Sequence, residues 1–215
     1  MRSRLVSART QLANQVRGLL MEYGIVLPQH ISQLRRGLPQ ILEEEGNELT
    51  PFTRRLLASL YDELVDLDQK LAAIEEQVGT AYRASESSQR IAAVEGVGPL
   101  TATALVAALS DGKAFQNGRQ FAAWLGLVPR QHSSGGKPRL FGISKRGDSY
   151  LRTLLIHGAR SVVYRAGRKN DGRSRWITDK RRRLGTTKAC VAVANKNARI
   201  VWGLIARKEA YQRAV

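Results

Sequence analysis

The chain has 215 residues and an ordinary 43% hydrophobic content, enough for one large or two modest globular domains. Its net charge of +17 is unusual and unevenly placed: residues 1–90 hold 11 Lys and Arg against 12 Asp and Glu, whereas residues 91–215 hold 24 against 6. No apolar run reaches the ~18 residues of a membrane-spanning helix, and no basic amphipathic helix carries the charge, which argues against a membrane partner. Nucleic acid is favoured, because a polyanion would neutralise a segment that otherwise repels itself.

The cysteine and histidine content argues against a disulfide framework and a zinc site. Cys190 is the single cysteine, and the three histidines are scattered along the chain. The N-terminus also lacks the continuous apolar stretch of a signal peptide. These features predict a cytoplasmic location.

Residues 1–85 are predicted to form a coiled-coil-like helical hairpin. Apolar residues recur at spacings of seven, four, three, four and three from Leu5 to Val26, and at spacings of four and three from Leu60 to Val78, in two heptad-like seams. Helix breakers separate the two seams: Gly24, Pro28, Gly37, Pro39, Gly46 and Pro51. One arm cannot cover both seams, so a homo-oligomer is expected. The acidic residues of this segment are interpreted as solvated faces.

Residues 90–215 are predicted to form a second, basic domain with a helical core, a helix-hairpin-helix and a Gly-rich basic loop, which makes the whole chain all-α. Its first motif is Ile91-Ala-Ala-Val-Glu-Gly-Val-Gly-Pro-Leu-Thr-Ala-Thr-Ala-Leu105. Gly96 and Gly98 end one helix and open the next, with Pro99 early in the second helix. This pattern is typical of a helix-hairpin-helix, whose backbone N–H groups face a phosphate without reading sequence. The alternative is a tight turn between two core helices.

Further helices are expected over residues 118–126, from Asp148 or Ser149 to about Ala166, around 176–183, and over 187–211. Residues 167–175 are interpreted as a cationic loop, and the three tryptophans as packing residues. Arg152, on the polar side of its helix, and the run Arg181, Arg182 and Arg183 are candidate nucleic-acid contacts.

The loop over residues 130–149 carries the candidate chemistry. Ser133 and Ser134 precede a Gly-Gly pair, and five cations flank them: Arg130, Lys137, Arg139, Lys145 and Arg146. A hydroxyl on a strongly positive loop suits attack on a phosphodiester, because cations stabilise the charge that develops on the phosphate oxygens. The alternative is a surface loop whose serines bond only to the local backbone.

A serine hydroxyl must be activated before it attacks, and the basic half offers little for that purpose. Its six carboxylates are scattered: Glu95, Asp111, Asp148, Asp171, Asp179 and Glu209. A two-metal site needs several carboxylates that converge, so no metal site is predicted within this chain. His132 is a candidate base whose geometry the sequence does not fix.

Several motifs, taken in order, resemble one known family. They are Ile91-Ala-Ala-Val-Glu-Gly-Val-Gly-Pro-Leu-Thr-Ala, Phe121-Ala-Ala-Trp-Leu-Gly-Leu-Val-Pro129, Ser133-Ser-Gly-Gly-Lys, Ile143-Ser-Lys-Arg-Gly-Asp and Tyr150-Leu-Arg-Thr-Leu-Leu. They resemble the C-terminal transposase domain of the bacterial insertion-sequence family numbered one-ten, with its eleven-eleven branch nearest. Residues 1–90 resemble the coiled-coil segment of that family.

The resemblance implies a recombinase that breaks DNA through a covalent phosphoserine link, guided by a structured bridge RNA. The family's catalytic serine directly precedes the first glycine, which implies Ser134 here. The resemblance also implies candidate contacts to DNA and guide RNA in a bacterial, nucleoid-associated protein. Family members carry an N-terminal RNase H-like domain whose acidic residues bind Mg²⁺. That domain is not in this sequence, so a truncated transposase is expected, with no cofactor of its own and no autonomous activity.

Three functions remain as alternatives. The first is a transposase with Ser134 as nucleophile, completed by a separate metal-binding domain. The second is a non-catalytic remnant that binds DNA or RNA, or that interferes with full-length transposase. The third is an oligomerising helical protein whose charge serves only RNA packaging or solubility. An acidic metal-binding domain encoded beside this chain would favour the first.

Overall fold

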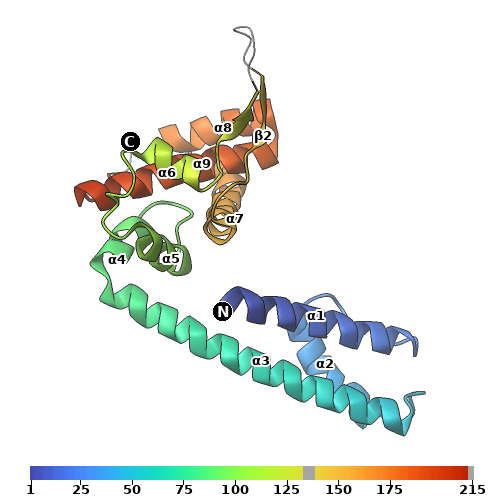
Figure 1. The fold of residues 1–215 in the computed structure, drawn as a ribbon. Helices are drawn as coiled ribbons and strands as arrows, with labels where there is room; N and C mark the ends of the chain where they lie inside the picture. The colour runs from blue at the N-terminus through green and yellow to red at the C-terminus, as the bar shows by residue number, and fades with distance from the viewer. Residues whose placement is uncertain (133–138, 213–215) are drawn as a thin grey trace. The chain divides into compact units, whose positions relative to one another are not determined.

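The computed structural model describes residues 1–132 and 139–212, and it divides the chain into two compact units, Met1–Gln77 and Val78–Val215 (Figure 1). We call these the N-terminal unit and the C-terminal unit. The described residues are helical apart from one two-stranded sheet, which confirms the prediction of an all-α fold. Across the same residues, no helix is both long enough and apolar enough to cross a membrane.

The N-terminal unit contains two long antiparallel helices and a short one. The long helices are α1 (Arg2–Met21) and α3 (Pro51–Ala84), and the short α2 (Ile31–Glu43) connects them in sequence. Arg2 Nη2 lies 2.7 Å from Glu75 Oε1, and Arg9 Nη1 lies 3.0 Å from Asp68 Oδ1. The partner residue number falls along α3 as the residue number rises along α1, so the two helices are antiparallel. The predicted seams contribute Leu5, Leu12, Val16, Leu64, Leu67 and Leu71 to one buried core, which also contains residues outside the predicted positions: Leu20, Leu34, Leu38, Leu49 and Leu57.

The segment between the two long helices is held by side-chain bonds to backbone carbonyls. A helix leaves its last carbonyl groups without internal partners. Arg54 provides donors for two carbonyl groups at the end of α2: its Nη1 donates to Leu42 O at 2.8 Å and its Nη2 donates to Glu44 O at 2.7 Å. The end of α2 is thereby attached to the start of α3.

The C-terminal unit is built around α9 (Thr186–Arg207), with α6 (Gly118–Trp124), α7 (Ser149–Arg165) and α8 (Gly172–Leu184) beside it (Figure 1). Its other helices are α4 (Glu86–Ala92), α5 (Pro99–Leu109) and the short 3₁₀ helix η1 (Ala166–Arg168). Small residues of α9 let its neighbours approach closely. Cys190 is one of these buried small residues. Burial raises the pKa of its thiol, which favours the neutral, protonated form.

Helix starts in this unit follow from capping side chains. Asp148 caps α7 by accepting from the Leu151 N–H at 2.9 Å, as predicted. Asp171 caps α8 in the same way, from the Ser174 N–H at 2.8 Å. The helix predicted around residue 176 therefore begins at Gly172, and the cationic loop expected up to residue 175 is shorter.

Two short strands, which the sequence did not predict, flank the serine segment. Strand β1 (Pro129–Gln131) pairs antiparallel with β2 (Leu140–Ile143), with Pro129 opposite Ile143 and Gln131 opposite Leu140. We call this antiparallel pair the β-hairpin. Both strands are largely exposed and lie in the segment that was predicted as a basic loop, so the core of this domain is helical, as predicted.

Candidate nucleic-acid interface

The candidate nucleophile lies, in the sequence, between the two strands of the β-hairpin. Ser134 and its neighbour Ser133 lie outside the described residues, and so does Lys137. The described flanks come together at the hairpin, where the His132 N–H donates to Arg139 O at 3.1 Å. Arg139 is exposed beside this bond. The two ends of the serine segment therefore leave one point on the surface of the C-terminal unit, next to a cation.

The loop after β2 is held against the end of α6 by two glycines. Gly126 has a φ of +71° and Gly147 a φ of +98°, which L side chains rarely adopt. A Cβ on Gly126 would overlap Arg146 O, and a Cβ on Gly147 would overlap Trp124 O. Only glycine permits this approach. It fixes the backbone of Lys145 and Arg146, whose side chains are exposed, directly beyond the hairpin.

Arg152 takes part in the same packing and is not a free surface cation. Its Nη1 donates to Leu125 O at 2.9 Å, and the side chain is half-buried. The bond satisfies a carbonyl at the end of α6. Three separate motifs, around residues 121–129, 143–148 and 150–155, therefore meet at one place. Arg152 thus attaches the start of α7 to the end of α6, and its partly exposed side chain stays a predicted nucleic-acid contact.

The two glycines of the predicted helix-hairpin-helix lie in different surroundings. Gly96 has a φ of +89°, and a Cβ there would lie 2.9 Å from Gly158 O of α7. Gly96 is therefore required for packing. Gly98 caps α5 with ordinary dihedrals, φ −84° and ψ 176°, and a Cβ there would meet nothing within 4 Å. Among the described residues, no side chain caps the N-terminus of α5, so Gly98 lies beside N–H groups that the helix itself leaves unpaired.

The run of three arginines closes α8 and is exposed. Arg183 Nη2 lies 2.6 Å from Asp179 Oδ2, and Arg182 Nη2 lies 3.5 Å from Asp179 Oδ1. These contacts hold the pKa of the Asp179 carboxyl below its ordinary value, chiefly through the bond from Arg183. Arg181 lies over the Tyr164 ring, 5.9 Å from its centroid. Two of the three cations are thus partly neutralised, and Arg181 is the least compensated.

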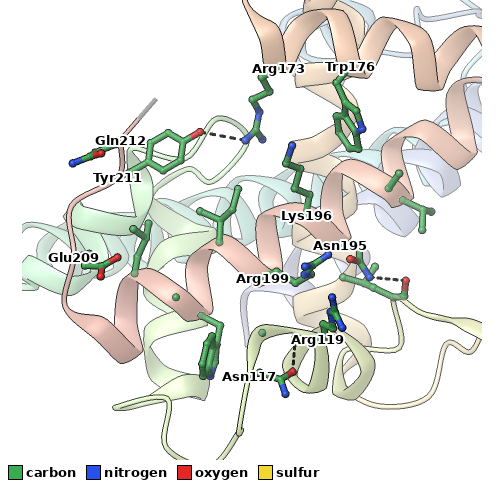
Figure 2. A pocket seen from close by; sticks show the side chains of 18 of the residues that line it. Asn117, Arg119, Arg173, Trp176, Asn195, Lys196, Arg199, Glu209, Tyr211 and Gln212 are labelled. Atoms are coloured by element: carbon green, nitrogen blue, oxygen red, sulfur yellow. Dashed lines mark hydrogen bonds between the residues drawn. The ribbon is translucent and has the colours of Figure 1, made fainter. Parts of the chain in front are cut away.

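A groove of 1790 Å³ extends along α9, and sequence reasoning missed it (Figure 2). We call it the α9 groove. Six cations line it: Arg119, Arg173, Lys188, Lys196, Arg199 and Arg207. Glu209 is the one carboxylate among the described residues that line it. Leu127, Pro129 and Ile143 also belong to its wall, so it reaches the base of the β-hairpin.

The floor of the α9 groove is a buried polar network. Arg173 is 8% exposed; its Nη2 donates to Asn197 Oδ1 at 2.5 Å and its Nη1 to the Tyr211 hydroxyl at 3.3 Å. Asn197 Nδ2 in turn donates to Glu95 O at 2.9 Å. Arg173 therefore holds α8 and α9 to the turn that contains Gly96, and Glu95 Oε2, 3.9 Å from its Nε, partly compensates its charge beneath the groove.

Lys196 lies above that charge, with its Nζ 4.4 Å from the centroid of the Trp176 ring. Burial lowers the pKa of the Lys196 ammonium, and repulsion from Arg173 and Arg199 lowers it further. Cations that destabilise one another in this way favour an anion between them. The sequence does contain a pattern that points to this groove, because Lys188, Lys196 and Arg199 lie on one face of a helix. The alanines and valines between them, however, are typical of a helix packed in a core.

Carboxylates do not gather at any of these sites. Within the described ranges, no three His, Cys, Asp or Glu side chains lie close enough to hold a metal ion. The cationic surfaces of the C-terminal unit can therefore bind and orient a polyanion.

Comparison with known proteins gives a consistent picture. A family model described as "Transposase IS116/IS110/IS902 family" matches residues 88–177. The chain is 49% identical, over 98% of its length, to a protein of Pseudomonas aeruginosa named "Probable family 20 transposase". It is 46% identical over 98% of its length to the transposase for insertion sequence element IS1111A of Coxiella burnetii, and 38% identical over 94% to that for IS1328 of Yersinia enterocolitica. It spans 63%, 58% and 59% of these relatives, respectively.

Proposed function

The chain belongs to the IS116/IS110/IS902 family of transposases, and on that premise we propose that it binds DNA through its C-terminal unit and supplies Ser134 as the nucleophile of strand breakage. One observation supports this proposal above all: the base of the β-hairpin lies next to the loop after β2, which Gly126 and Gly147 allow to pack against the end of α6. Arg139, Lys145 and Arg146 stand exposed at or directly beyond the base from which the serine segment leaves.

The proposed step is a transesterification. Ser134 Oγ attacks the phosphorus of a DNA phosphodiester, an Oγ–P bond forms, and the P–O bond to one deoxyribose breaks. The serine hydroxyl gives up its proton, and the departing sugar oxygen takes one. The exposed cations beside the hairpin stabilise the extra charge on the phosphate oxygens in the transition state.

Activation of the hydroxyl would come from outside the described residues. Those residues hold no carboxylate cluster that fits Mg²⁺, so the proposal assigns the metal to an RNase H-like domain and includes a guide RNA among the partners. The second candidate function is a non-catalytic nucleic-acid-binding protein that interferes with full-length transposase. A strand-breakage assay on the chain alone and on the completed complex separates the two.

Gly98→Asp is expected to weaken duplex DNA binding about fivefold to tenfold at low salt while leaving the fold intact. Aspartate is a preferred N-cap residue and meets no neighbour at this position, so α5 should be as stable as before. Its charge would repel a phosphate at the helix N-terminus. Mobility-shift titration on several duplex sequences, with thermal melting alongside, measures both effects.

Gly98→Ser is the matched control, because serine also caps the helix but carries no charge. It should bind like the unmodified chain. If Gly98→Asp also binds like the unmodified chain, the turn only connects two core helices.

Self-association through the N-terminal unit is a further part of the proposal. Several large apolar side chains of this unit are exposed, among them Met21 (70%), Val26 (80%) and Phe52 (68%). We expect the full chain to sediment as a dimer or larger assembly at micromolar concentration. Phe52→Glu should shift it towards the monomer, and a strict monomer in the unmodified chain would refute this part.

A further inference from the structure

We propose that the α9 groove holds one unpaired strand of nucleic acid, with its phosphates on Lys188, Lys196 and Arg199 and its bases against the apolar wall. The inference rests on the proposed function and adds the form of nucleic acid that this surface takes. It assigns a role to residues at some distance in sequence from the serine segment.

The first argument is uncompensated charge. Lys188, Lys196, Arg199, Arg119 and Arg207 line the α9 groove, and none of them forms an ion pair within the described residues. Figure 2 shows Lys196 and Arg199 on the same side of α9, with Arg119 approaching from the start of α6. Folding has brought these charges together without a protein partner, which a polyanion can supply.

The second argument distinguishes a single strand from a duplex. Between the cations the wall is apolar and aromatic, with Ile200, Trp176 and Tyr211 among the lining residues. A duplex stacks its base faces inside and offers such a wall its sugar-phosphate backbone and base edges, whereas an unpaired strand offers base faces as well. Grooves that combine a positive track with aromatic side chains are typical of proteins that bind single strands.

The third argument is continuity with the β-hairpin. Pro129 and Ile143, which pair at the base of the hairpin, belong to the groove wall. Asn195 Nδ2 donates to Leu127 O at 3.2 Å and fixes α9 against the chain that enters the hairpin. From Lys188 to Arg207 the helix rises about 28 Å, which matches roughly eight phosphates at a stacked spacing of ~3.4 Å. A strand near the serine segment can therefore continue into the groove.

The test compares salt dependence for single strands and duplex. A variant carrying Lys188→Gln, Lys196→Gln and Arg199→Gln is titrated with labelled 20-nucleotide oligo(dT), oligo(U) and a mixed-sequence duplex over a range of salt. Losing three phosphate contacts should make the log–log slope for the single strands shallower by about 2, at about 0.7 for each contact. The duplex slope should stay unchanged.

The matched control removes the same charge from another surface of the C-terminal unit, through Arg160→Gln, Arg165→Gln and Arg168→Gln, all exposed. It should leave the single-strand slope as it was. Trp176→Leu should weaken single-strand binding about tenfold without changing the slope, and Trp176→Phe should restore it.

The outcomes separate this inference from the proposed function. A shallower slope with oligo(dT), with oligo(U) or with both supports the groove as a single-strand site and tells which strand it takes. If the groove variant binds both single strands with the original slope, or loses duplex binding equally, the inference is overturned and DNA binding stands. If the unmodified chain binds neither duplex nor single strand at low salt, the proposed function fails instead.

Discussion

Ser134→Ala is expected to reduce covalent protein–DNA adduct by at least about a thousandfold in a reaction completed with an RNase H-like domain, Mg²⁺ and guide RNA. Alanine offers no oxygen to form the bond to phosphorus, and losses of this size are typical when a nucleophile is removed. Duplex binding should remain near that of the unmodified chain, because the hydroxyl makes a bond and contributes little to electrostatic attraction. Labelled DNA retained on protein after denaturing electrophoresis measures the adduct.

Ser133→Ala is the matched control, since it removes a hydroxyl one residue away. It should retain most of the adduct. An adduct that persists in Ser134→Ala, or one lost only in Ser133→Ala, contradicts the assignment of the nucleophile.

Salt dependence of duplex binding is the second large effect. If the C-terminal unit neutralises about six phosphates, its affinity for duplex DNA should fall about a thousandfold between 50 and 200 mM salt. The charge of +14 across residues 130–188 motivates the expectation. Lys145→Gln with Arg146→Gln should make the log–log slope shallower by about 2, because each lost phosphate contact changes it by about 0.9.

A control with the same change of charge is available in the N-terminal unit. Arg4 and Arg55 are exposed there, in a region that is nearly neutral overall. Replacing both by glutamine should leave the slope unchanged. An affinity that does not respond to salt would exclude phosphate contacts as the source of binding.

Local signals in the sequence predicted most of the helical fold. The seams from Leu5 and from Leu60 have a three-and-four spacing, which one helical face produces wherever it is buried. Asp148 could be identified as a cap because capping depends on neighbours three residues away. The same rule applied to Asp171 would have placed the start of α8 correctly.

Features that depend on distant residues could not be predicted. Strands β1 and β2 have three and four residues, and pairing of Pro129 with Ile143 across the serine segment leaves little alternation in the sequence. Gly96 suggested a phosphate contact, but its close neighbour is Gly158, more than sixty residues away. Lys196 lies over the ring of Trp176, which belongs to another helix, and this contact places it in the α9 groove. Each of these contacts exists only after folding.

The most direct measurement of the central claim is to locate the DNA on the protein. The completed reaction is stopped by denaturation, digested with nuclease and trypsin, and sequenced by tandem mass spectrometry. Trypsin does not cleave before Pro138, so the relevant peptide is residues 131–139, whose only hydroxyl side chains are Ser133 and Ser134. Our account predicts a residual nucleotide on Ser134. A nucleotide on Ser133 or on another peptide, or its absence from the protein while DNA strands are broken, would contradict it.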